Sequence, residues 1–149
     1  MQAYPHHYRV SADAAHSGVI DVSSPGLENL PTQAPAEFGG PGDLWSPETF
    51  LVAAVANCLI LTFRAVARGA RFEWNAMRVE VDGKLDRVDN VTQFTDFFIK
   101  AELNVPAGSD VSKAEHMLHR SEAVCLITNS LTGQCHLEIA ITSDDQEAP

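Results

Sequence analysis

The stretch that decides the fold is "SPETFLVAAVANCLILTF", residues 46–63, an alanine-rich apolar run with one cysteine, Cys58, inside it. Its side chains from residue 49 to residue 63 are apolar nearly all round, so a helix formed here must be covered by protein on both flanks. The apolar part, residues 50–61, contains Asn57 and is shorter than the ~20 residues that cross a bilayer. The run therefore predicts a buried central helix and no membrane span.

The ends of this helix are also marked in the sequence. Ser46 is a favoured N-cap residue, Pro47 suits the first helical position, and Glu48 favours the positive end of the helix. Gly69, which directly follows Arg68, is a favoured helix stop. The helix is therefore predicted to begin at Ser46 and to run to about Arg68.

Length and charge restrict the class of protein. A chain of 149 residues is expected to form a single domain, and the excess of 20 acidic over 10 basic residues gives a formal net charge of -10. This charge repels phosphate backbones and anionic lipids, so neither nucleic acid nor membrane is expected as a partner. The first residues do not resemble a secretory signal and the last resemble no anchor, which predicts a cytoplasmic protein.

The remaining segments predict strands and one more helix. Apolar and polar residues alternate at period two in several of them, which is typical of strands with one wet face. Residues 109–123 instead place apolar side chains on one helical stripe. The stripe consists of Ala114, Met117, Leu118 and Ser121. The predicted order is two strands around "DAAHSG", a long ordered loop over 25–45, the central helix, strands within 75–88 and 95–106, the second helix, and a strand over 134–142.

This order predicts an α+β fold. A largely antiparallel sheet would pack on the long buried central helix and on the second, amphipathic helix.

The cysteines are candidates for chemistry. Cys58 alone fits a buried core residue, since free cysteine is among the most buried residue types. Cys125, however, lies near the end of the second helix, and two helices that each carry one thiol could pack those thiols together. One thiolate could then attack a peroxide O–O bond and become a sulfenic acid, and the other thiol could condense with it. An apolar pocket around the attacking sulfur would suit an apolar hydroperoxide.

Glu48 is the nearest acidic residue before Cys58, but one helix cannot bring the two together. Ten residues of helix rise ~15 Å, so a glutamate that meets Cys58 would come from a second chain, with two such helices antiparallel at a dimer interface. The alternative is a plain charge at the helix N-terminus, worth only ~0.3–1 kcal/mol.

Two segments resemble a known family. "SPETFLVAAVANCLILTF" is similar to the motif of the OsmC/Ohr family of peroxide-detoxifying proteins, in which a Pro-Glu pair opens a long helix with the peroxidatic cysteine. "SEAVCLITNSL", residues 121–131, resembles the family segment with the resolving cysteine, and "LDRVDNVTQFTDFFIKAELNVPAG" resembles its central hairpin. The resemblance covers nearly the whole chain.

The resemblance implies an intertwined homodimer that reduces organic hydroperoxides in oxidative stress defence, with two active sites at the subunit interface. Cys58 would be the attacking thiol, Cys125 the resolving thiol, and Glu48 the carboxylate that orients the site. The reductant would be a dithiol, which is a lipoyl group in the Ohr branch. No Rossmann fingerprint is present, and no cofactor is expected.

One position departs from the family pattern. The family's characteristic arginine lies in the turn between the first two strands, where this sequence has Ala15 or His16. Losing a permanent positive charge near the sulfur lowers its reactivity, unless His16 protonates or Arg9 reaches across. The "GGPG" loop and the hairpin also favour an OsmC-like relative over a strict Ohr protein. Two alternatives therefore stay open: a scaffold that binds an apolar small molecule with weak or no peroxidase activity, and a purely structural dimer.

Other candidate residues are assigned structural roles. Cys135 shares a strand face with Leu137 and Ile139, which favours core packing. His116 and His119 lie three residues apart on the second helix, but they lack a third ligand, so no metal site is expected.

Overall fold

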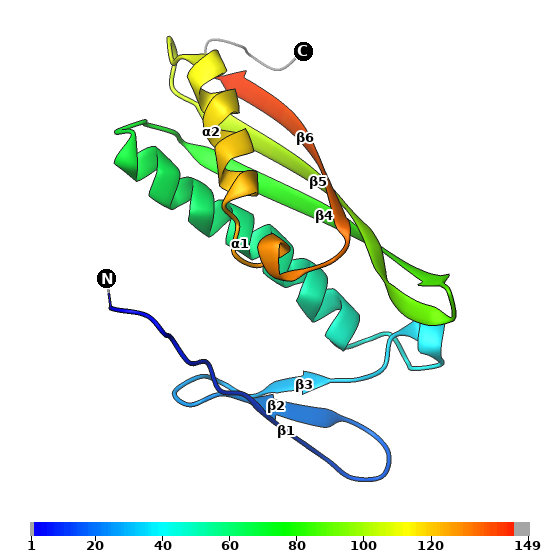
Figure 1. The fold of residues 1–149 in the computed structure, drawn as a ribbon. Coiled ribbons are helices and arrows are strands. Elements are labelled where there is room, and N and C mark those ends of the chain that lie inside the picture. The colour runs from blue at the N-terminus through cyan, green and yellow to red at the C-terminus, as the bar shows by residue number, and fades with distance from the viewer. Residues whose placement is uncertain (1, 145–149) are drawn as a thin grey trace. The chain divides into compact units, whose positions relative to one another are not determined.

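The computed structural model describes residues 2–144 of the chain. Two compact units are distinguished, Met1–Leu51 and Val52–Pro149, and each is described by itself. The elements follow the order β1 (Ser11–Ala14), β2 (Ile20–Ser23), β3 (Leu30–Thr32), η1 (Ala36–Phe38), α1 (Pro47–Gly69), β4 (Ala76–Val88), β5 (Val91–Val105), α2 (Val111–Ala123), η2 (Thr128–Ser130) and β6 (Gln134–Ser143), where η marks a 3₁₀ helix (Figure 1).

The first unit contains a three-stranded antiparallel sheet in the order β1-β2-β3. The predicted strand pair around "DAAHSG" is confirmed, with Ala14 opposite Ile20. The prediction of an irregular loop over residues 25–45 was wrong in part, because this segment holds β3 and η1. β3 contains Pro31, which cannot donate a ladder hydrogen bond, and it lies at the sheet edge, where proline is tolerated.

The long helix α1 begins and ends as predicted. The Ser46 N–H donates to Thr49 Oγ1 over 2.8 Å, and the Thr49 N–H donates to Ser46 Oγ over 3.2 Å. This reciprocal pair satisfies backbone donors that a helix N-terminus leaves free, and Pro47 at the first position has no N–H to satisfy. The last helical residue is Gly69.

The second unit contains a three-stranded sheet in the order β4-β5-β6. β4 and β5 form an antiparallel hairpin whose two-residue turn, Asp89 and Asn90, has positive φ at both positions, as a turn matched to the strand twist requires. β6 pairs parallel to β5, so the largely antiparallel sheet that was predicted carries one parallel pair. A parallel neighbour needs a crossover connection, and α2 provides it.

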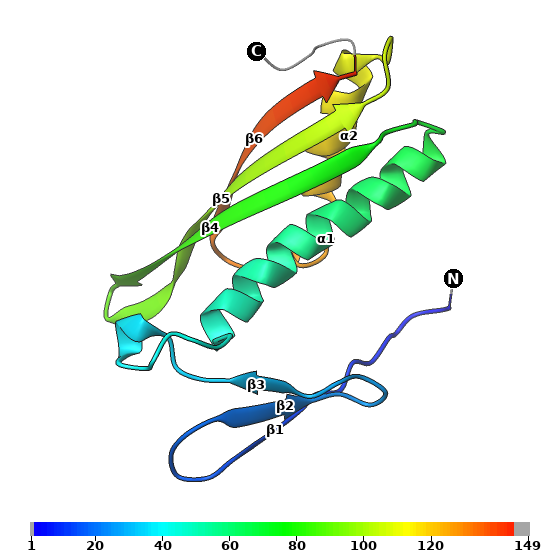
Figure 2. The same ribbon diagram turned by 180° about the vertical axis from the view of Figure 1, so that it is seen from behind.

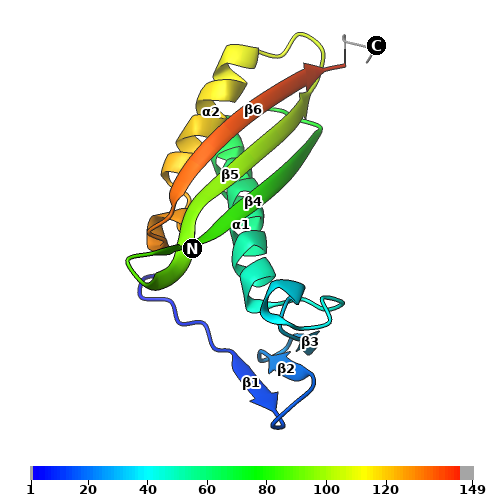
Figure 3. The same cartoon turned by 90° about the vertical axis from the view of Figure 1, so that its right-hand side faces the viewer.

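The core of this unit lies between the sheet and the helices. α1, from Val52 onward, and α2 cover one face of the β4-β5-β6 sheet (Figures 2 and 3). Alternate β5 side chains on this face are at most 2% exposed: Phe97, Ile99, Ala101, Leu103 and Val105. From α2, the predicted stripe is buried as expected: Ala114, Met117, Leu118 and Ser121.

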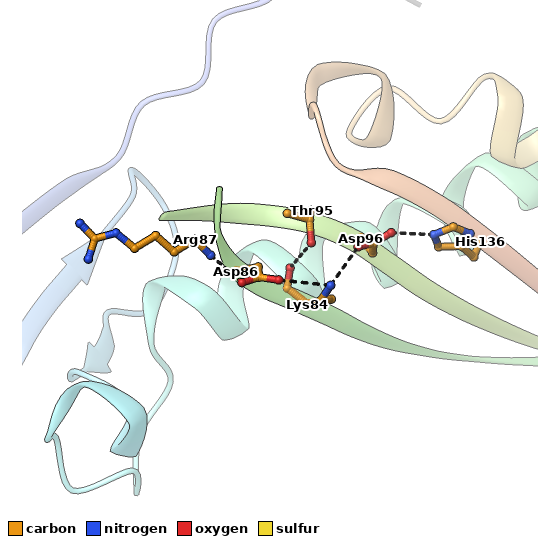
Figure 4. Close-up of polar contacts among 6 residues, drawn as sticks. All are labelled: Lys84, Asp86, Arg87, Thr95, Asp96 and His136. Carbon is orange, nitrogen blue, oxygen red and sulfur yellow. Dashed lines mark hydrogen bonds and ion pairs between the residues drawn. The ribbon is translucent and has the colours of Figure 1, made fainter. Parts of the chain in front are cut away.

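The opposite face of the sheet is polar and solvated. Lys84 Nζ lies 3.3 Å from Asp86 Oδ2 and 3.9 Å from Asp96 Oδ2, and His136 Nε2 lies 2.9 Å from Asp96 Oδ1 (Figure 4). Pairs this exposed are worth only about 0–1 kcal/mol each. They make the face soluble rather than hold the fold together.

The composition of α1 meets the length and hydropathy criteria for a membrane span. It has 23 residues, and its most apolar 18-residue window has a mean hydropathy of 2.0. Core helices of soluble proteins meet the same criteria, so this is weak evidence for a span.

Candidate active site

Cys58 lies near the middle of α1, on the side that faces the core. Its side chain is 8% exposed, between the buried Val55 and Leu59. One helical turn further on, Thr62 Oγ1 lies 3.8 Å from the Cys58 sulfur. Residues four apart share one face of a helix, so the backbone itself brings this hydroxyl to the thiol.

Cys125 directly follows α2, whose C-cap is Val124, and its side chain is fully buried. Its carbonyl oxygen accepts the Asn129 N–H over 3.0 Å and the Thr128 hydroxyl over 3.1 Å. These bonds fold the segment after α2, drawn in orange in Figure 1, into a tight turn that continues into η2. The turn fixes both the Cys125 thiol and the backbone N–H groups of the next two residues.

The two thiols influence each other's ionisation, and the surroundings of Cys58 favour its ionised form. Burial is the largest single influence and raises the pKa of Cys58. Hydrogen bonds from the Cys125 thiol, the Ile127 N–H, the Thr62 hydroxyl and the Leu126 N–H together outweigh it, so the pKa of Cys58 is lowered below its ordinary value.

Cys125 is shifted in the opposite direction. Burial raises its pKa, and the neighbouring Cys58 raises it further, while the hydrogen bonds of Thr128 lower it by less. Its thiol therefore keeps its proton at a pH where Cys58 is already ionised. Of the two thiols, Cys125 is therefore the one that keeps its proton to the higher pH.

Glu48 lies in the first turn of α1, as predicted. Its Oε2 is buried and has no hydrogen-bond partner among residues 2–144. A buried carboxylate oxygen without a partner costs free energy, which favours a partner that residues 2–144 do not supply. Glu48 belongs to the first compact unit, whereas both cysteines belong to the second. Its role at the thiols stays a prediction.

The turn that departs from the family pattern is solvent-exposed. Ala15 and His16 are both exposed, and His16 Nε2 lies 3.4 Å from Ser17 Oγ. Within residues 52–144, the groups that lower the pKa of Cys58 are neutral hydrogen-bond donors. In this unit, dipoles rather than a guanidinium stabilise the sulfur.

Cys135 lies on the C-terminal strand and His116 and His119 lie on the second helix, the elements in which the sequence predicted them. Cys135 is half-buried on the β6 face that carries Leu137 and Ile139, and burial, followed by the charges of Glu122 and Cys125, raises its pKa. The histidines of α2, His116 and His119, are exposed. Among residues 2–144, no group of three His, Cys, Asp or Glu side chains is placed to hold a metal ion.

The sequence did not predict two parts of the site. Thr62 could have been found, because it lies four residues after Cys58 on a predicted helix. The N–H groups of Leu126 and Ile127 could not have been found from the sequence. No side-chain pattern indicates that a turn will direct a backbone N–H group toward another element.

Comparison with known proteins assigns the family. A family model described as OsmC-like protein matches residues 40–140. The chain therefore belongs to the OsmC-like protein family, as its sequence predicted. YmaD of Bacillus subtilis, an uncharacterized protein, is 26% identical over 113 residues, which is 70% of this chain and 72% of YmaD.

Solved structures share the fold. An OsmC-like protein of unknown function from Vibrio cholerae superposes with a TM-score of 0.83 at 18% identity, covering 91% of this chain and 99% of that one. OsmC of Legionella pneumophila, described as an organic hydroperoxide resistance protein, gives 0.71 at 19% identity, covering 94% and 99%. The predicted α+β, OsmC-like fold is thus confirmed.

Proposed function

We propose that the protein is a cysteine-based peroxidase that reduces organic hydroperoxides. The observation that carries this proposal is the opposed ionisation of two thiols that influence each other: the pKa of Cys58 is lowered and that of Cys125 is raised. A two-cysteine cycle needs this difference, because the attacking sulfur must be ionised and its partner must hold a proton until the first step is complete. The description of the Legionella relative as an organic hydroperoxide resistance protein supports the substrate class.

The cycle balances with the two thiols and one hydroperoxide. The Cys58 thiolate attacks the terminal oxygen of ROOH, the O–O bond breaks, and Cys58 becomes a sulfenic acid while the alkoxide takes a proton and leaves as ROH. Cys125 then attacks the Cys58 sulfur, a disulfide forms, and water is released. A dithiol, such as a lipoyl group on a partner protein, restores both thiols by exchange.

Glu48 and dimerisation complete the proposal. Residues 1–149 form one OsmC-like domain in a cytoplasmic homodimer, and Glu48 of one chain orients the site of the other. Two features of residues 2–144 support this arrangement: Glu48 Oε2 has no partner among them, and they leave many α1 side chains half-buried or exposed. Leu61 on α1, for example, is 52% exposed.

Thiol counting tests the chemistry. Reduced protein is mixed with one equivalent of cumene hydroperoxide, and free thiols and disulfide-linked peptides are measured by mass spectrometry. Two thiols are expected to disappear, with Cys58 joined to Cys125, and Cys135→Ser is expected to behave like the unchanged chain. Cys125→Ser should stop at a sulfenic acid on Cys58. If neither thiol is oxidised while an apolar ligand binds and Cys58→Ser still binds it, the protein is a binding scaffold instead.

A further inference from the structure

The Thr62 hydroxyl is directed at the Cys58 sulfur. Within residues 2–144 its one hydrogen-bond partner is that sulfur, at 3.8 Å, although threonine in a helix commonly bonds the carbonyl oxygen one turn earlier. The position is half-buried and flanked along α1 by apolar residues, where valine would fill the same volume. The hydroxyl is therefore an addition that helix packing does not require.

The hydroxyl acts together with the turn after α2. The N–H groups of Leu126 and Ile127 approach the same sulfur from the other element, so the Cys58 sulfur is held between donors from α1 and donors from the turn. A hydroxyl rotates freely and either donates or accepts, so it donates once the sulfur is ionised. A hydrogen bond to the charged form of a group favours that form.

We infer that Thr62 is a positioning residue that stabilises and orients the Cys58 thiolate through its hydroxyl. This inference rests on the proposed function for its purpose, but the hydrogen bond itself is independent of peroxide turnover. It assigns Thr62 no contact with the substrate.

Two substitutions separate the hydroxyl from the shape of the side chain. Thr62→Val keeps the branched shape and removes the hydroxyl, and Thr62→Ser keeps the hydroxyl and removes a methyl group. In the reduced full-length chain, the rate of Cys58 alkylation by iodoacetamide is followed against pH by mass spectrometry of the Cys58 peptide. Thr62→Val is expected to raise the midpoint by about one pH unit, and Thr62→Ser is expected to stay near the unchanged chain.

Several outcomes would overturn the inference. The inference is wrong if Thr62→Val titrates like the unchanged chain, or if Thr62→Ser shifts the midpoint as far as Thr62→Val does. Urea unfolding of each variant shows whether it is folded, and Thr62→Ala against Thr62→Ser gives the same comparison if valine does not fit. A shifted midpoint in a chain that fails to reduce hydroperoxides would uphold Thr62 and reject the proposed function.

Discussion

The two cysteines differ because their donors differ. The pKa of Cys58 is lowered by the Thr62 hydroxyl, the Cys125 thiol and two backbone N–H groups, whereas the groups that lower the pKa of Cys125 belong to Thr128. Burial removes water from both thiols and disfavours their charged forms. Only around Cys58 do the hydrogen bonds stabilise the charged form by more than burial destabilises it. The assignment of attacker and resolver, which the sequence offered only through resemblance, is thus supported by physical chemistry.

Selective alkylation tests this difference. Because the pKa of Cys58 is lowered and that of Cys125 is raised from the same ordinary value of 9.0, the thiolate of Cys58 appears first as pH rises. Iodoacetamide at pH 7–8 is therefore expected to label Cys58 before Cys125, as measured by peptide mass spectrometry over time. Cys135, whose pKa is also raised, serves as the internal reference. Faster labelling of Cys125 than of Cys58 would contradict the assigned roles.

At the residue scale, the sequence predicted the functional side chains of the site better than its functional backbone groups. It singled out both cysteines, and the spacing of Thr62 was open to the same reasoning. The donors of residues 126 and 127 depend on how the carbonyl of Cys125 is held by Thr128 and Asn129. The conformation of this turn depends on how the segment after α2 packs, and the local sequence pattern does not predict that packing.

At the scale of elements, α1 and β4 approach closely at one glycine. A Cβ placed on Gly83 would lie 2.6 Å from Val52 Cγ2 and 3.0 Å from Phe94 Cε1. Both atoms belong to short or rigid side chains, so the helix would have to move away from the strand. The close contact explains a glycine in the interior of a strand, where it is otherwise unfavourable.

Replacing this glycine is expected to loosen the packing of α1 on the sheet. Gly83→Ala should lower the free energy of unfolding by about 1–3 kcal/mol, as overpacking does, and urea denaturation measures it. Gly69→Ala is the matched control, because nothing lies within 4 Å of a Cβ at the end of α1 and its φ is not positive. Equal stability of the two variants would mean that the helix and strand are not in tight contact.

Elements were predictable where their periodicity was long and clear. The positions of α1, α2 and the strands β4 and β5 follow from their apolar spacing. In the structure, Asp110 caps α2, and its side chain accepts the Lys113 N–H. β3 was missed because it has three residues and a proline. The parallel pairing of β6 was missed because a strand with one wet face alternates in the same way beside either kind of neighbour.

At the scale of the whole molecule, residues 2–144 leave part of the apolar surface of α1 exposed. The apolar sequence of α1 predicted that protein covers both flanks of the helix. In the structure, however, Leu61 is 52% exposed and several neighbouring side chains are only half-buried. An uncovered apolar surface on a soluble protein is typical of an interface. The homodimer proposed above would cover it with a second copy of this chain.

A charge on that surface should separate the copies. Leu61→Glu is expected to convert a dimer into a monomer, as measured by sedimentation velocity. Val111→Glu is the control, since Val111 is 47% exposed at the first position of α2, where a negative charge is favourable. If Leu61→Glu sediments like the unchanged chain, α1 is not the dimer interface.

The position of the two thiols along the chain has a consequence for thermal stability. Cys58 precedes the β4–β5 hairpin and α2, and Cys125 follows them, so a bond between the sulfurs would close one long loop around these elements. Loop closure removes entropy from the unfolded chain, by about 4 kcal/mol for a loop of this size. Protein oxidised with cumene hydroperoxide should therefore melt at a higher temperature than the same sample after dithiothreitol, and equal melting temperatures would argue against the bond. A simple melting curve would then report how far each sample is oxidised.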